Sequence, residues 1–60
     1  MYVLEIAYNG GTKTFMSTGE LYRDRFALVL KHIEVGETFR VQDVVFNPVH
    51  IVFAQTYEYK

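Results

Sequence analysis

The stretch from Ser17 to Gly36, STGELYRDRFALVLKHIEVG, most constrains the fold, because it predicts one amphipathic helix in a chain whose other segments predict strands. Ser17 and Glu20 have the S-x-x-E spacing of a capping box, in which each side chain bonds the backbone amide of the other residue. Gly36 can adopt the left-handed conformation that ends a helix. About seventeen residues are therefore expected to be helical, with a length of roughly 25 Å at 1.5 Å per residue.

This helix has one face suited to a core and a second, half-apolar stripe beside it. The core face follows the i, i+4, i+7 spacing of an amphipathic helix. Its residues are Tyr22, Phe26, Val29, Leu30 and Ile33. The second stripe follows at spacings of four, three and four residues, and it consists of Leu21, Arg25, Leu28 and His32.

A single sheet on one side of the helix does not cover both stripes, and two interpretations remain open. In the first, Leu21 and Leu28 lie at the margin of a wide core face, since singly exposed leucines are ordinary on protein surfaces. In the second, the stripe of Leu21, Arg25, Leu28 and His32 is an interface that contacts a partner, most simply the same helix of a second subunit.

The segment before the helix predicts a β-hairpin. Residues 2–8 alternate with period two, which places the even positions from Tyr2 to Tyr8 on the inward face. Asn9-Gly10-Gly11 is a hairpin signal, and a two-residue turn centred on Asn9-Gly10 or on Gly10-Gly11 fits it. In the returning strand, 12–16, Phe15 is expected on the face of Leu4 and Ile6.

The segment after the helix predicts two further strands. The first is expected at about 38–46 with a bulge near Gln42-Asp43. The alternative ends it at Val41 and makes 43–46 a short helical turn, and Asn47-Pro48 is a turn in both cases. The last segment, 49–60, is long for a strand, so its distal half is free to pair outside the subunit. Alternation places one set of its residues on a common face: Val49, Ile51, Phe53, Tyr57 and Tyr59.

The expected fold class is therefore α+β, with a single domain over residues 1–60. Its order is β-β-α-β-β, with a four-stranded antiparallel sheet and the amphipathic helix packed on one face. A chain of 60 residues has a marginal core, and proteins of this size usually add disulfides, a metal or a partner subunit. Because the chain has no cysteine, and His32 and His50 lack a metal-ligand spacing, we expect a homodimer, no metal site and no cofactor.

Several function classes are not supported by the sequence. No apolar run approaches the roughly 20 residues of a membrane span, and no signal-peptide pattern is present, so a cytoplasmic protein is expected. There is no phosphate-binding glycine loop, no nucleophile motif and no pair of carboxylates for acid-base work. A domain of this size also has little room for a small-molecule pocket. We therefore expect a protein that is not an enzyme and has no small-molecule substrate.

Two binding hypotheses remain. The first is a small regulatory or interaction protein, since the second helix stripe and the five tyrosines provide contact area for a macromolecule. Small cysteine-free proteins are often encoded by phages or mobile elements, and this association suggests a host protein as the partner. The alternative is a protein that binds RNA or single-stranded nucleic acid with basic side chains and stacking tyrosines, although the net charge is only −1. The residues of this alternative are Arg23, Arg25, Lys31, Arg40, Tyr57 and Tyr59.

Overall fold

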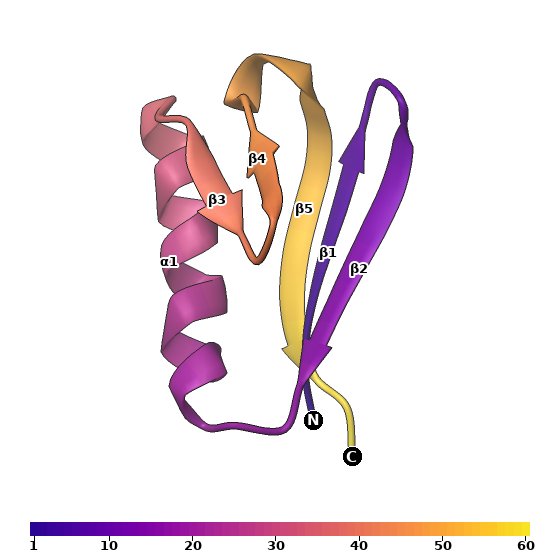
Figure 1. Cartoon of the computed structure of the whole chain (residues 1–60), viewed down its shortest axis with the longest axis vertical. Helices are drawn as coiled ribbons and strands as arrows, with labels where there is room; N and C mark the ends of the chain where they lie inside the picture. Colours follow the sequence, from indigo (N-terminus) through magenta and orange to yellow (C-terminus); the bar gives the residue numbers. More distant parts are fainter.

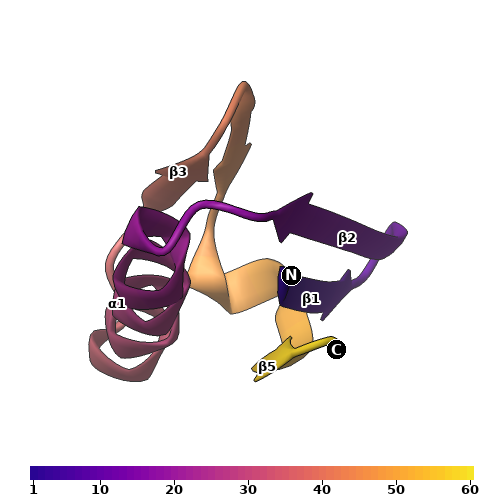
Figure 2. The ribbon, with the colours of Figure 1, turned by 90° about the horizontal axis from the view of Figure 1, so that it is seen from below.

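A three-stranded antiparallel sheet forms one layer of the fold, and a helix and a small hairpin together cover one of its faces (Figure 1 and Figure 2). The computed structural model describes all residues from 1 to 60. The elements are β1 (Tyr2–Tyr8), β2 (Gly11–Ser17), α1 (Leu21–Val35), β3 (Phe39–Val41), β4 (Val44–Phe46), the 3-10 helix η1 (Pro48–His50) and β5 (Ile51–Glu58). The strand order in the larger sheet is β2-β1-β5, and β3 pairs with β4 in a second sheet.

The predicted N-terminal hairpin is confirmed. Tyr8 pairs with Gly11, so the turn is the two-residue Asn9-Gly10 alternative. Leu4 pairs with Phe15, and both side chains are buried on the face that α1 and the second hairpin cover. The inner face of this larger sheet therefore follows the period-two pattern of the sequence.

The predicted single four-stranded sheet is wrong, because residues 38–46 form a second hairpin. Neither the bulged strand nor the helical turn is present, although the first strand does end at Val41. Gln42 has a positive φ of 54° and begins a two-residue turn with Asp43. Val41 then pairs with Val44, and Phe39 pairs with Phe46. The reversal moves the inward positions from odd to even numbers, which looks like a break in alternation when the stretch is read as one strand.

The predicted common face of the last strand is also wrong, because β5 contains a bulge. Tyr8 pairs with Ile51 but Ala7 pairs with Phe53, so Val52 has no partner in β1. The extra residue changes which positions face inward. Beyond the bulge, Phe53 and Tyr57 therefore lie on the outer face of the sheet, while Ile51 stays on the inner face.

The outer face of the sheet carries apolar side chains that no other element covers. Val3 lies at its centre and is only 2% exposed, flanked across the strands by Met16 and Tyr57. Phe53 remains 48% exposed and Tyr57 42% exposed. This face is therefore partly apolar, in contrast to the polar outer face that is usual for a one-sided antiparallel sheet.

The helix begins later than predicted and without the predicted capping box. Ser17 is the last residue of β2, where it pairs with Tyr2, and its Oγ accepts a bond from the Gly19 amide at 3.3 Å. Glu20 is the N-cap residue and its side chain makes no capping bond. The predicted stop is confirmed, since Gly36 has a left-handed φ of 79° and its amide bonds to the carbonyl oxygens at the end of α1.

The core lies between the sheet, the helix and the β3–β4 hairpin. Its eight buried residues are Leu4, Ile6, Phe15, Phe26, Val29, Phe39, Val41 and Phe46. The predicted core face of α1 is confirmed, with two of its residues buried and the other three packed against the core: Tyr22, Leu30 and Ile33. The short hairpin contributes three of the eight core residues, so it is part of the fold and not an appended loop.

The hairpin turn predicts a stabilising substitution. Gln42→Gly should raise the free energy of unfolding by about 0.5 kcal/mol or more, because a side chain in the left-handed region costs about 1–2 kcal/mol and glycine relieves that cost. Asp43→Gly is the control. It should lower stability, because Asp43 has no positive φ for glycine to relieve and glycine increases the conformational entropy of the unfolded chain. Urea unfolding followed by circular dichroism measures both changes. A loss of stability in Gln42→Gly would contradict the turn assignment.

Candidate functional site

A cleft that joins residues from different parts of the chain lies between α1 and β3, which are side by side in Figure 1. It consists of two shallow hollows of about 320 Å³ each, and both are bordered by Arg25, Val29 and Arg40. We call it the α1–β3 cleft. Its lining residues are Tyr22, Arg25, Phe26, Leu28, Val29, His32, Phe39, Arg40, Val41 and Gln42.

The floor of the α1–β3 cleft is apolar and rigid. Val29 from the helix and Phe39 and Val41 from β3 belong to the buried core. Phe26 lies beneath the helix end of the cleft, where its ring meets that of Tyr22 edge-on at 5.5 Å. Because these residues are fixed by core packing, the cleft is formed before any ligand arrives.

One rim of the cleft carries an arginine with no acidic partner. The guanidinium carbon of Arg25 lies 5.7 Å from the centre of the Tyr22 ring, within the range of a cation–π contact. None of the three ion pairs in the structure includes Arg25. Its guanidinium therefore keeps all of its hydrogen-bond donors for a ligand.

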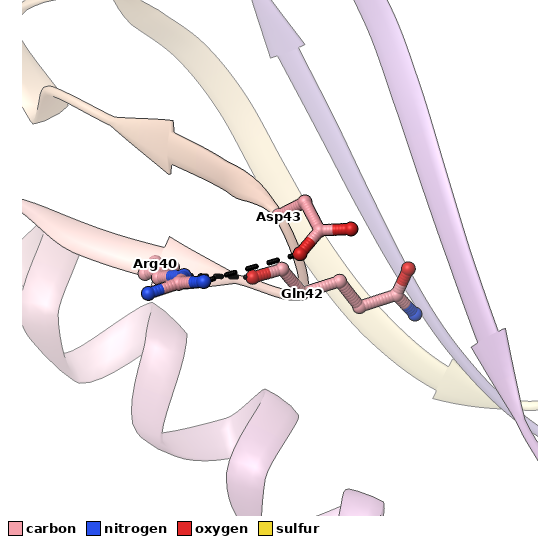
Figure 3. A network of polar contacts seen from close by, with 3 residues as sticks. All are labelled: Arg40, Gln42 and Asp43. Atoms are coloured by element: carbon pink, nitrogen blue, oxygen red, sulfur yellow. Dashed lines mark hydrogen bonds and ion pairs between the residues drawn. The ribbon is translucent and has the colours of Figure 1, made fainter.

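The opposite rim carries Arg40 on β3, and the hairpin turn orients it (Figure 3). Its Nε donates to the carbonyl oxygen of Gln42 at 2.9 Å, and its Nη2 lies 3.9 Å from Oδ1 of Asp43. The ion pair is long and exposed, and pairs of this kind contribute little to stability. The turn therefore positions the guanidinium and leaves most of its charge open to a ligand.

His32 closes one end of the cleft. Its ring stacks on Phe39 with an interplanar angle of 15° and a separation of 6.4 Å between ring centres. Its Nδ1 lies 3.9 Å from a carboxylate oxygen of Glu37. His32 thus covers part of an aromatic ring of the floor while its imidazole stays at the surface.

The structure places most of the predicted interface stripe in this cleft. Arg25, Leu28 and His32 line it, whereas Leu21 lies outside it near the start of the helix. Leu21 is 61% exposed and Leu28 is 53% exposed, so neither is part of the core. The interpretation that depends on a partner therefore stays open, and the part of the stripe beside the hairpin consists of Arg25, Leu28 and His32.

The residues predicted for nucleic-acid binding are divided between two sides of the molecule. Arg25 and Arg40 share the α1–β3 cleft, but Arg23 lies against Asp24 at 3.8 Å, and Lys31 is not among the lining residues. Tyr57 lies on the outer face of the sheet, and Tyr59 follows β5. The predicted combination of basic helix residues and stacking tyrosines is therefore not assembled in one place.

The floor of the cleft was not predicted from the sequence, because the hairpin that forms it was not predicted. Phe39, Val41 and Gln42 come from that hairpin. A signal was present in the stretch F-R-V-Q-D-V-V-F, where two polar residues lie between two three-residue segments that each have an apolar residue at both ends. A hairpin interpretation of that stretch places Phe39, Val41, Val44 and Phe46 on one side.

No group of three or more His, Cys, Asp or Glu side chains is arranged to hold a metal ion. No helix has the length and apolar character needed to cross a membrane. The chain matches no protein-family model, no curated protein and no solved structure.

Proposed function

We propose that this protein is a non-enzymatic interaction module that binds a protein partner in the α1–β3 cleft. The partner is expected to present a short segment with apolar and acidic side chains. The observation that carries this proposal is the pair of arginines, Arg25 and Arg40, on opposite rims of an apolar floor.

The chemistry of the rims supports an acidic segment. An arginine guanidinium binds a carboxylate through two parallel hydrogen bonds, and such bonds are about twice as strong as neutral ones. Arg25 has no acidic partner within the chain, and Arg40 has only a long, exposed one. A ligand carboxylate therefore replaces little existing interaction when it binds at either rim.

The floor of the cleft and the adjoining surface of α1 support the presence of apolar side chains in the partner segment. Leu28 is exposed at the edge of the cleft, and Tyr22 supplies an amphipathic ring beside Arg25. Tyrosine and arginine are the side chains that most often dominate binding energy at protein interfaces. The small size of the cleft suits one short segment of the partner, which is typical of regulatory contacts.

The nucleic-acid alternative is less well supported. Arg25 and Arg40 also suit phosphate groups. However, the tyrosines proposed to stack bases lie on the opposite side of the sheet from α1, so a strand held at the cleft does not reach Tyr57. The net charge of −1 adds no general attraction for a polyanion.

The proposal predicts that reversing the charge of the cleft abolishes partner binding. Arg25→Glu combined with Arg40→Glu should weaken binding about tenfold or more, because carboxylates of the partner then meet like charges in a desolvated contact. The matched control is Arg23→Glu combined with Lys31→Glu, which makes the same change in net charge outside the cleft. The measurement is a quantitative pull-down from a lysate of the native host after nuclease treatment, with wild type and both variants as bait. Equal capture by all three baits would contradict the proposal.

A second prediction separates protein from nucleic acid as the ligand. A labelled single-stranded RNA of mixed sequence should show no gel shift with the wild-type protein at 150 mM salt. Binding that falls steeply as salt rises, and that is lost in the Arg25→Glu, Arg40→Glu variant, would replace the protein partner with a nucleic acid.

A further inference from the structure

We propose that the free edge of β5 pairs with β5 of a second copy of this chain, joining two three-stranded sheets into one six-stranded antiparallel sheet. This inference is independent of the α1–β3 cleft. It assigns the dimer contact to the terminal strand and not to the exposed leucines of α1.

The hydrogen-bonding groups of β5 show which residues face the open edge. Met1 and Tyr59 exchange both of their backbone bonds, at 2.7 and 3.0 Å. Bonded and non-bonded pairs alternate in an antiparallel ladder, so Tyr57, Gln55 and Phe53 also direct their backbone groups toward β1. The amides and carbonyls of Ala54, Thr56 and Glu58 therefore point away from β1, and Figure 2 shows no strand beyond β5 on that side.

Between the bulge at Val52 and Glu58, this edge lacks the features that normally prevent strand pairing. The segment from Phe53 to Tyr57, FAQTY, contains no charged residue, no proline and no glycine, and it lies beyond the bulge at Val52. Natural edge strands are usually protected by such residues or by bulges. The other edge of the sheet, β2, carries Lys13 near its centre and Gly11 at its start.

The same segment is self-complementary. Antiparallel pairing of one strand with its own copy is two-fold symmetric, as the commonest dimers are. With the axis at Gln55, Phe53 lies opposite the second copy's Tyr57, and Ala54 lies opposite the second copy's Thr56. The Ala54–Thr56 pairs then use the free backbone groups, and the Phe53–Tyr57 pairs take the non-bonded positions where side chains approach most closely.

The centre of this register has matching polar chemistry. Nε2 of Gln55 donates to Oε1 of Glu5 at 2.9 Å on the outer face. That bond leaves one N–H and the amide oxygen of Gln55 free. Two Gln55 side chains that meet at a two-fold axis satisfy each other with reciprocal hydrogen bonds, and Glu5 holds each of them in place.

The inner side of the edge leaves room for the added strand. A shallow groove of about 310 Å³ runs between α1 and β5, with Leu30, Ile33 and Glu34 on the helix side and residues 51–54 on the strand side. In the proposed register, Thr56 of the second copy lies opposite Ala54 at this groove, and its side chain is small enough to lie along it. In this register Glu58 lies opposite Val52, so no two like charges are directly opposed.

A second copy would also add to the small buried core of a single chain. A chain of 60 residues without cysteine has a small core, and oligomerisation is a common means of stabilising one. The residues that border the α1–β5 groove and those that line the α1–β3 cleft do not overlap. The dimer therefore leaves both clefts open on the same face of the joined sheet.

Single cysteines test the register, because the chain has no cysteine of its own. Gln55→Cys should form an intermolecular disulfide under mild oxidation, since non-bonded cross-strand Cα atoms lie about 4.5 Å apart, within the range that a disulfide spans. Leu28→Cys and Thr14→Cys, on the helix and on β2, should stay largely monomeric on non-reducing gels. Preferential cross-linking of Leu28→Cys would assign the dimer to the helix and overturn the proposal.

A charge substitution tests the same contact without cross-linking. Glu5 lies opposite both Gln55 and Thr14, so Gln55→Glu and Thr14→Glu each place a carboxylate beside it within one subunit, and Gln55→Glu also removes the hydrogen bond that Gln55 donates to Glu5. Only Gln55→Glu also places two carboxylates across the dimer axis. Sedimentation equilibrium should therefore show a dimer for wild type and Thr14→Glu, and dissociation at least tenfold stronger for Gln55→Glu.

The test of dimerisation can fail without affecting the test of partner binding in the α1–β3 cleft. Circular dichroism confirms that each variant is folded, and the Arg25→Glu, Arg40→Glu variant should dimerise normally. A wild type that is monomeric at 0.5 mM, or equal dissociation of Gln55→Glu and Thr14→Glu, would overturn the β5 dimer while leaving the proposed cleft function untouched.

Discussion

The packing of Phe46 against the sheet is the interaction on which the rest of this structure depends. Its ring meets those of Tyr8 and Phe15 edge-on at 6.0 and 6.1 Å, and it stacks on Phe39 at 5.4 Å. These contacts fasten a hairpin of only three residues per strand to the larger sheet. An isolated two-stranded hairpin is marginally stable in water, so β3 and β4 exist because this aromatic cluster holds them.

The position of the hairpin determines where the surfaces of the molecule lie. β3 packs beside one flank of α1 and forms the α1–β3 cleft there, while β5 lies beside the other flank. The helix therefore separates two regions of different chemistry. One has arginines above an apolar floor, and the other has a bare strand edge beside small and apolar side chains. The proposed self-contact and the proposed partner contact therefore use different residues of the chain.

The sequence predicted the elements whose signals are local. The alternation of residues 2–8, a tight turn within Asn9-Gly10-Gly11, the core face of α1 and its stop at Gly36 each depend on neighbours in the chain, and all are present. The capping box failed because Ser17 is used by β2, where pairing with Tyr2 competes with a role at the helix. The bulge at Val52 and the turn at Gln42 were missed because each shifts a period-two pattern by one position.

By itself, the sequence determined that this is an α+β chain with one amphipathic helix, an N-terminal hairpin and no cysteine to support a small core. Only the tertiary structure decided that the half-apolar stripe of α1 lies partly beside β3. It also decided that Tyr57 faces away from the helix, on the outer face of the sheet. The physical reason is that the position of the hairpin follows from the packing of Phe46 on Phe15, which is distant in the chain, and that the outward orientation of Tyr57 follows from the bulge at Val52 where β5 pairs with β1. Arg25 and Arg40 share a cleft because of those contacts and not because of their spacing in sequence.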